Sequence, residues 1–323
     1  MNNNINNILS LLADGDCHSG SEIGQRIGVS RAAVWKQLQK LVDIGLDLES
    51  VKGKGYRLVG GFEALNREVI YGFLNSTAQK SLSELEVFSN IESTNIHAMN
   101  RVSEGGAKGY ACLTEYQSSG KGRRGRQWVS PFGHNVYLSL VWEFDGGVSQ
   151  LEGLSLAVGV AIAQSLQEVG LDQIGLKWPN DILLEQKKLG GILLEIQGDP
   201  SGVCQVVIGV GINVRMKADA AIDQPWASIA DCLPDVSRNE LTGSLLNNLV
   251  AMLLVYEDAG FAKFQSSWER LDAFRGEKVE IVSGLSRVGG VASGVYSNGA
   301  LRLIVDGIDR PIYGGEVSLR RTG

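Results

Sequence analysis

Four cations gather in one glycine-rich stretch, EYQSSGKGRRGRQWVSP, at residues 115–131. They are Lys121, Arg123, Arg124 and Arg126. No Asp or Glu lies between Tyr116 and Trp142 to neutralise them. Glycine lets backbone N–H groups approach a ligand closely, and uncompensated guanidinium groups bind phosphate or carboxylate. The stretch therefore predicts a loop that closes over an anion, although a solvated basic surface loop has the same composition.

The spacing of Gly120, Gly122 and Gly125 matches the G-x-G-x-x-G pattern of dinucleotide-binding folds. That pattern requires a helix immediately afterwards, whereas Trp128 and Pro131 follow here. The sequence therefore disfavours a Rossmann-type site, and the glycines are better explained by the mobility of the loop.

Charged side chains also flank two later turns. Lys177 and Asp181 bracket the proline turn of KWPNDI, and Lys188 opens a strand beside the two glycines of KLGGIL. A lysine at the start of a strand is usually just exposed. The less common alternative is a cation held against a phosphate or carboxylate.

The stretch ESTN at residues 92–95 precedes a helical pattern. Ser93 or Thr94 can cap that helix, which is the commoner role of such residues. A helix start also offers free N–H groups to an anion, so capping and ligand binding are compatible.

Composition indicates a globular chain with more than one domain. At 323 residues, two or three domains are expected. The 44% apolar and 20% charged residues are typical of soluble proteins, and the formal net charge is −6. A general affinity for polyanions is therefore not expected, and any nucleic-acid contact must come from a local basic face.

The compartment is predicted from the cysteines and the first residues. Four cysteines are scattered without C-x-x-C spacing, which disfavours a zinc site or a disulfide framework and fits a reducing cytosol. The start, MNNNINN, lacks the cationic and apolar regions of a signal peptide, and no run is long enough to span a bilayer. We therefore expect a cytoplasmic protein without a membrane partner.

Residues 5–60 predict three helices and a hairpin. Ile8 and Leu12 recur at helical spacing, Ser21 can cap a second helix that Gly28 ends, and Ser30 can cap a third. Beyond the third helix, KGKGYRLV belongs to a two-stranded ribbon with a cationic, glycine-rich tip. A ribbon directly after a helix-turn-helix resembles the wing of winged-helix DNA-binding domains.

Basic residues concentrate on this unit. From Arg31 to Arg57 there are six cations and three anions. A recognition helix in the major groove with the wing on the neighbouring backbone would use residues of the third helix and the ribbon tip. The predicted DNA-binding residues are Ser30, Arg31, Lys36, Lys40, Lys52 and Lys54. A protein-interaction module, or cations that only solvate the helix, remain alternatives.

The rest of the chain predicts an α+β architecture. Residues 61–84 form a link with some helical pattern, followed by mixed strands and helices, with a tight turn at Gln186-Lys187. A helical pattern returns at residues 241–273. After it, short alternating strands and the hairpin signal Asn298-Gly299 predict a small barrel-like β module.

Six motifs in order resemble the biotin protein ligase family, including its bifunctional form that represses the biotin operon. They are ESTN at 92–95, EYQ…GKGRRGRQW at 115–128, KWPNDI at 177–182, KLGGIL at 188–193, GVGIN at 209–213 and GGEVSL at 314–319. The resemblance covers nearly the whole chain. It implies a winged helix-turn-helix domain at 1–64, a mixed α/β ligase domain at 65–273, and an SH3-like β-barrel at 274–323.

The resemblance implies a two-step reaction with biotin, ATP and Mg²⁺. Biotin's carboxylate attacks the α-phosphate of ATP to give biotinyl-5′-adenylate and pyrophosphate. The adenylate then acylates one lysine of the biotin carboxyl carrier protein of acetyl-CoA carboxylase. The attacking groups come from biotin and the acceptor lysine, so no Ser/His/Asp or Cys/His nucleophile is required.

The resemblance also implies the residues of the site. Ser93, Thr94, Asn95 and Gln117 would hold the biotin rings, and Trp128 would suit the valeryl tail. Lys121, Gly122 and Arg123 would close over the intermediate. Lys188, Arg123 and Asp181 would be catalytic, with Asp181 the nearest plausible Mg²⁺ ligand, although a structural role for it is equally open. The remaining predicted ligand-binding residues are Gly120, Gly191, Gly209 and Asn213.

Family membership further implies regulation. With the adenylate bound, the loop would order, the central domains would pair through a sheet edge, and the homodimer would bind a palindromic operator. One departure bears on this: Lys121 stands where the family loop usually has arginine, and the two are not equivalent in planar bidentate contacts. Retention of the adenylate is therefore in question.

Two other functions remain open from the sequence. A biotin-sensing transcription factor without ligase chemistry would keep the pocket but lose the reaction. A ligase whose winged helix does not bind DNA would keep the reaction and lose the repression.

Overall fold

The N-terminal unit is a winged helix-turn-helix, as predicted. The computed structural model describes residues 3–199, 201–216, 222, 224–283, 286–314 and 317–321. The unit's helices and strands are α1 (Asn3–Leu12), α2 (Gly20–Ile27), α3 (Arg31–Asp43), β1 (Leu48–Val51) and β2 (Gly55–Leu58). Ile8, Leu12, Ile23, Val34 and Leu38 form its core, each at most 1% exposed.

Two serines begin the second and third helices. Ser30 caps α3 as predicted, because its Oγ accepts the Ala33 N–H at 3.3 Å. The prediction that Ser21 caps α2 was wrong. Ser19 holds that position, with its Oγ accepting the Glu22 N–H at 3.1 Å. Ser19 has the extended backbone of a cap, whereas Ser21 lies inside the helix.

A seven-stranded sheet forms the centre of the chain, in the order β3-β4-β5-β9-β8-β7-β6. The β3–β4 pair is parallel and the other pairs are antiparallel. The strands are β3 (Glu84–Phe88), β4 (Tyr110–Thr114), β5 (Asn135–Phe144), β6 (Ile174–Lys177), β7 (Asp181–Leu184), β8 (Lys187–Gly198) and β9 (Cys204–Asn213).

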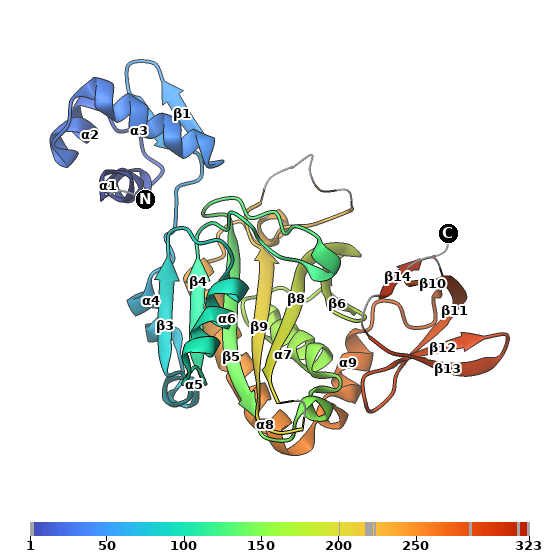
Figure 1. Ribbon diagram of the computed structural model, residues 1–323. Helices are drawn as coiled ribbons and strands as arrows, with labels where there is room; N and C mark the ends of the chain where they lie inside the picture. The colour runs from blue at the N-terminus through green and yellow to red at the C-terminus, as the bar shows by residue number, and fades with distance from the viewer. Residues whose placement is uncertain are drawn as a thin grey trace.

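Helices cover both faces of this sheet (Figure 1). Alternate residues of β5 and β9 point to opposite faces. Leu140 and Ile208 pack with α7 (Leu154–Glu168) and α8 (Arg238–Ala259), while Val141 and Val207 pack with α6 (Thr94–Glu104). The predicted link at 61–84 contains α4 (Arg67–Phe73) and α5 (Ser76–Ser81), which contact α8, and α9 (Gln265–Leu271) follows α8.

One predicted turn is displaced by a residue. The hairpin between β7 and β8 turns at Glu185-Gln186 rather than Gln186-Lys187, because Leu184 pairs with Lys187. Both turn residues have positive φ, 47° and 67°, as a type I′ hairpin requires.

The C-terminal module is a five-stranded antiparallel sheet. Among the described residues the order is β13-β12-β11-β10-β14. The strands are β10 (Lys278–Ser283), β11 (Ser286–Val295), β12 (Leu301–Val305), β13 (Ile308–Ile312) and β14 (Val317–Arg321). The predicted turn at Asn298-Gly299 joins β11 to β12, and Tyr296 N–H donates to the Ala300 carbonyl at 2.8 Å. Within the GGEVSL motif, residues 315–316 lie outside the described residues.

The winged helix and the β module lie on two sides of the domain that contains the central sheet (Figure 1). The winged helix projects from the end near β3 and β4, and the β module lies beside β6 and α9. In the described part of the chain, no helix has the length and apolar composition needed to cross a membrane.

Candidate active site and DNA-binding face

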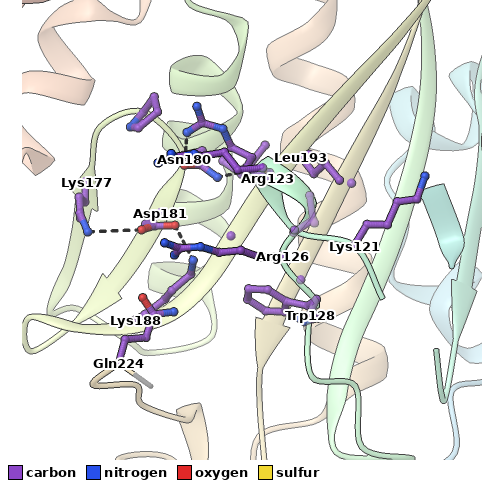
Figure 2. A pocket seen from close by; sticks show the side chains of 18 of the residues that line it. Lys121, Arg123, Arg126, Trp128, Lys177, Asn180, Asp181, Lys188, Leu193 and Gln224 are labelled. Atoms are coloured by element: carbon purple, nitrogen blue, oxygen red, sulfur yellow. Dashed lines mark hydrogen bonds and ion pairs between the residues drawn. The ribbon is translucent and has the colours of Figure 1, made fainter. Parts of the chain in front are cut away.

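A cavity of about 490 Å³ lies where the basic loop crosses the central sheet. It is lined by the loop, the start of α6, strands β5 to β9, residues 224–225, and three residues of the C-terminal module. Figure 2 shows the loop side chains over the sheet, with Lys177 and Lys188 on strands β6 and β8. The cavity divides into a neutral polar end and a cationic end.

The neutral end is a hydrogen-bonded cluster at the start of α6. Ser93, Thr94, Asn95 and Gln117 are each at most 8% exposed. Gln117 Oε1 accepts the Thr94 N–H at 2.9 Å, and Gln117 Nε2 donates to Ser130 Oγ at 3.0 Å. Ser93 stands at the N-cap position but makes no side-chain capping bond. Gln117 therefore satisfies the helix start, a role that the sequence predicts for Ser93 or Thr94.

Asn95 is fixed from both sides. Its Oδ1 accepts from Ser139 Oγ at 2.6 Å, and its Nδ2 donates to Glu195 Oε2 at 2.8 Å. The second carboxylate oxygen of Glu195 lies 3.5 Å from Lys121 Nζ in the loop. A buried amide with both ends bonded keeps one orientation.

Glycines in the strands make room for these side chains. A Cβ at Gly209 would lie 2.2 Å from Asn95 Oδ1, and one at Gly211 would lie 2.8 Å from the Trp128 ring. A Cβ at Gly191 would meet the same indole at 3.3 Å. The glycines of the KLGGIL and GVGIN motifs therefore let Asn95 and Trp128 rest directly on the sheet.

The cationic end is organised around Asp181. Its Oδ1 lies 2.7 Å from Lys188 Nζ and its Oδ2 lies 3.6 Å from Lys177 Nζ. Lys188 also lies 5.4 Å from the centre of the Trp128 ring. Figure 2 shows Lys177 and Lys188 converging on Asp181 from two strands, and Arg126 extending over the cavity toward them.

Arg123 links the loop to the proline turn. Its Nη1 donates to Asn180 Oδ1 at 2.8 Å, and Asn180 Nδ2 donates to the Ile192 carbonyl at 2.8 Å. Burial lowers the pKa of Arg123, while the Asp181 charge raises it. Burial likewise lowers the pKa of Lys177 against the opposing effect of Asp181. The negative charge of Asp181 therefore offsets part of the effect of burial on both cations.

The surroundings of Asp181 bear on the predicted magnesium site. Two ammonium groups already neutralise its carboxylate. Among the described residues, no group of three or more His, Cys, Asp or Glu could hold a metal ion. This donor set fits an anchor for lysines better than a site in which the protein alone holds Mg²⁺, and the metal assignment stays a prediction.

Buried contacts fix both ends of the loop. Strand β4 ends at Thr114, so the near end is anchored on the sheet as predicted. The adjacent Glu115 pairs with Arg238 Nη1 at 2.7 Å and accepts the Leu65 N–H at 2.6 Å. At the far end, the rings of Phe132 and Phe62 stack 5.8 Å apart.

Most predicted ligand residues line this cavity. They are Ser93, Thr94, Asn95, Gln117, Lys121, Gly122, Arg123, Trp128, Asp181, Lys188, Gly191 and Gly209. Gly120 and Asn213 do not line it. Gly120 lies at the base of the loop, where its carbonyl accepts the Trp128 N–H at 2.8 Å. Asn213 is buried and donates to the Ala227 carbonyl at 3.2 Å.

The predicted DNA-binding residues lie on α3 and the wing. Arg31, Lys36 and Lys40 are exposed along α3, and Lys52 and Lys54 are exposed at the β1–β2 tip. Ser30 caps α3. The winged helix therefore presents its cations to solvent.

Comparison with known proteins decides the family. A model described as the biotin/lipoate A/B protein ligase family matches residues 87–213, and an HTH domain model matches residues 4–57. The bifunctional ligase/repressor BirA of Escherichia coli (strain K12) is 40% identical over 315 residues, which are 97% of this chain and 96% of the relative. The chain belongs to the biotin protein ligase family.

Other biotin protein ligases agree with this assignment. The bifunctional ligase/repressor BirA of Bacillus subtilis (strain 168) is 30% identical over 93% of both chains. A solved biotin protein ligase from Aquifex aeolicus, in complex with biotin and ATP, superimposes with a TM-score of 0.65 at 26% identity. That comparison covers 75% of this chain and all of the other.

In this member of the family, further residues beyond the individually predicted ligand contacts line the cavity. Arg124, Arg126, Lys177, Asn180 and Gln224 line it, as do Phe274, Leu319 and Arg320 of the C-terminal module. Asn180 and Lys177 belong to the KWPNDI motif, and the arginines belong to the recognised loop. Phe274 and Arg320 carry no local signal, because only the tertiary fold brings the C-terminal module to the cavity.

Proposed function

We propose that the cavity binds biotin and ATP and converts them to biotinyl-5′-adenylate and pyrophosphate. The chain then transfers the biotinyl group to a lysine of a biotin carboxyl carrier protein. One observation carries the proposal: a neutral hydrogen-bonding cluster and a cationic cluster adjoin in a single cavity. Biotin and its adenylate have the same division, with a ureido ring at one end and a phosphate at the other.

The neutral end recognises the biotin rings. A ureido group has two N–H donors and one carbonyl acceptor, which hydroxyl and amide groups can pair. Ser93, Thr94, Asn95 and Gln117 supply such groups. Thr94 and Gln117 bond each other, and Asn95 bonds Ser139 and Glu195, so these side chains are held in place before biotin arrives. The Trp128 ring, on Gly191 and Gly211, supplies apolar surface for the valeryl tail.

The cationic end stabilises adenylation. A carboxylate oxygen of biotin attacks the α-phosphorus of ATP, and the bond from that phosphorus to the β-phosphate bridging oxygen breaks to release pyrophosphate. Negative charge accumulates on the phosphoryl oxygens during this step. Lys188 and Arg123 are placed to bind that charge, while Asp181 holds Lys188 at 2.7 Å and positions it.

Magnesium enters with the nucleotide in this scheme. Mg²⁺ usually retains waters and binds substrate phosphates with one or two carboxylates. Asp181 is the carboxylate of the cavity lining that could contribute. When bound, the ion would neutralise part of the triphosphate charge.

The second step transfers the acyl group. The ε-amine of the acceptor lysine attacks the acyl carbon of the mixed anhydride, the acyl–oxygen bond breaks, and AMP leaves. The side of the cavity away from the sheet is closed by the loop, so movement of the loop controls access of the carrier.

We extend the proposal to repression, with biotinyl-5′-adenylate as corepressor and a homodimer as the DNA-binding form. Strand β8 pairs with β9 on one side along its length, but on the other side it pairs with β7 only as far as Gly191. Among the described residues, 193–198 therefore have no strand partner on that second side. Ile196 on that edge is 45% exposed. A second copy could extend the sheet there and place two winged helices on a palindromic operator.

We place the domain boundaries at 1–64, 65–273 and 274–323, in a cytoplasmic protein. Phe62 packs in the winged-helix core and Leu65 packs in the central core, which supports the first boundary. Ala273 N–H still donates to Leu176 in the central sheet, whereas Gly276 N–H donates to Ala292 in the β module. All four cysteines are free thiols, which supports a reducing compartment.

The decisive experiment supplies labelled biotin, Mg-ATP and a purified carrier domain. We expect label on the carrier only when ATP and the acceptor lysine are both present. Binding of biotin without any transfer would instead support a biotin-sensing transcription factor. Transfer without adenylate-dependent binding to the operator region would support a ligase whose winged helix does not repress.

A further inference from the structure

Trp35 differs from the other tryptophans in its exposure to water. It is 56% exposed, whereas Trp142, Trp178 and Trp268 are each 1% exposed. Trp128 and Trp226 are half-buried. An indole is a large, rigid apolar surface that gains by packing against a partner. Its position on α3, the predicted recognition helix, indicates what that partner is.

Trp35 lies on a face of α3 that contributes nothing to the core. The core face consists of Val34, Leu38 and Leu41. Arg31 and Gln39 lie four residues before and four residues after Trp35, so they share its side of the helix. Both side chains are exposed. Arginine and glutamine are the side chains that read guanine and adenine through paired hydrogen bonds.

This face borders the wing. A Cβ added at Gly20, the first residue of α2, would lie 3.4 Å from both Arg31 Cγ and Tyr56 Cε2. Arg31 and Tyr56 of β2 therefore both lie against the start of α2. Helix-turn-helix domains dock DNA through the N-terminal residues of the recognition helix, with the wing on the adjacent backbone.

The domain that carries Trp35 also exposes cations on α3 and on the wing. Lys36 and Lys40 are exposed farther around α3, and Lys52 and Lys54 are exposed at the wing tip. Lysine contacts with phosphates position a protein on DNA but carry no sequence information. An apolar contact from Trp35 to a base can carry sequence information.

We propose that Trp35 reads a thymine in each operator half-site by packing its indole ring against the C5-methyl group in the major groove. This inference rests on the proposed operator binding. Apolar contact with that methyl group distinguishes thymine from cytosine at the same position. Trp35 is therefore a specificity residue, while the lysines supply general affinity.

In the test, the protein is first saturated with biotin and Mg-ATP. It is then used to select the duplexes that it binds from a random DNA library. Each thymine of the selected duplex is then replaced by deoxyuridine, which removes only the methyl group. At one position per half-site, we expect deoxyuridine to lower the affinity of the wild type about fourfold. That is the change expected from losing the burial of one methyl group. Trp35→Ala should weaken binding roughly tenfold and abolish that deoxyuridine penalty.

Three comparisons make the result specific. Val59→Ala removes another exposed apolar side chain of the same domain, 49% exposed, and should leave the deoxyuridine penalty intact. Trp35→Phe should retain part of it. Lys36→Ala should reduce the slope of log affinity against log salt by about 1, whereas Trp35→Ala should leave the slope unchanged. Thermal unfolding midpoints of all variants should match the wild type.

Two outcomes would overturn the inference in distinguishable ways. If duplexes are enriched but deoxyuridine costs the same in the wild type and in Trp35→Ala, Trp35 does not read thymine, although operator binding stands. If no duplex is enriched at all, the proposed operator binding fails and the role of Trp35 fails with it.

Discussion

The floor of the cavity, formed by strands β8 and β9 and the start of α6, and the loop above it are built in contrasting ways. On the floor, Asn95 is 4% exposed and has hydrogen-bond partners on both ends of its amide. In the loop, the Lys121 side chain is 44% exposed, and Arg126 lies exposed over the cavity. The polar groups of the floor therefore hydrogen-bond one another. In the loop, Lys121 contacts Glu195, whereas Arg126 extends over the cavity.

The difference separates two tasks of one cavity. A preorganised floor loses little conformational entropy when biotin binds, so recognition of the rings does not depend on the nucleotide. Lys121 and Arg123 of the loop already contact Glu195 and Asn180, and we predict that binding of the triphosphate or the adenylate orders the rest of the loop by relieving repulsion among its cations. The account therefore predicts separable effects on biotin binding and on phosphate chemistry.

The largest effect on catalysis is expected at Lys188, which lies at the cationic end of the cavity beside the ring of Trp128. Lys188→Ala removes the cation 2.7 Å from Asp181 and leaves that carboxylate facing the incoming phosphates. We expect the kcat/KM of adenylate formation to fall roughly 10²- to 10³-fold. Biotin-dependent pyrophosphate release measures it. Lys187→Ala, the exposed neighbour, is the matched control, and equal losses in both variants would remove Lys188 from the chemistry.

The next effect is on the free energy of unfolding and concerns Asp272, which lies between the central sheet and the β module. Burial raises the pKa of Asp272 to about 6, while its hydrogen bond from the Phe274 N–H lowers it. The folded state therefore holds this proton more tightly than the unfolded chain between its usual pKa of 3.8 and about 6. Stability then falls as pH rises through that window, by up to about 3 kcal/mol.

Asp272→Asn should remove that loss. We expect the variant to be more stable than the wild type at pH 7.5 and nearly equal to it at pH 4, by urea unfolding followed at both values. A variant that is less stable at pH 7.5 would mean that the charge is compensated in the folded chain.

Gly209 tests whether the floor is already formed. A Cβ there would lie 2.2 Å from Asn95 Oδ1, so Gly209→Ala must displace Asn95 from Ser139 and Glu195. We expect the KM for biotin to rise roughly tenfold or more, with a smaller change in the KM for ATP. Gly72→Ala is the control, because a Cβ at Gly72 meets nothing within 4 Å. An unchanged KM for biotin would show that the floor adapts.

The smallest effect is expected from the exposed part of the loop. Arg126→Ala removes a cation that extends over the cavity. Adenylate should therefore dissociate about tenfold faster, because one contact with its phosphate is lost. The KM for biotin should stay within about twofold of the wild-type value. Filter retention of labelled adenylate measures the first quantity. An equal rise in the KM for biotin would break the division between floor and loop.

The sequence predicted well what depends on local pattern. The cationic loop, the motif glycines and the winged helix all follow from composition and spacing within a few dozen residues. It did not predict that Gln117 would bond the start of α6 in place of a serine, since those residues lie on separate elements. Asn213 belongs to a family motif, yet it points to Ala227 because the chain beyond β9 folds back against it. Phe274 and Arg320 reach the cavity only through the packing of the C-terminal module.

The central claim is that the cavity itself makes the acyl phosphate that the loop then holds. Purified chain incubated with biotin and Mg-ATP, without carrier, should release one pyrophosphate per site and retain biotinyl-5′-adenylate, seen as a noncovalent mass by native mass spectrometry. Release of no pyrophosphate, or its release without biotin, would contradict the account.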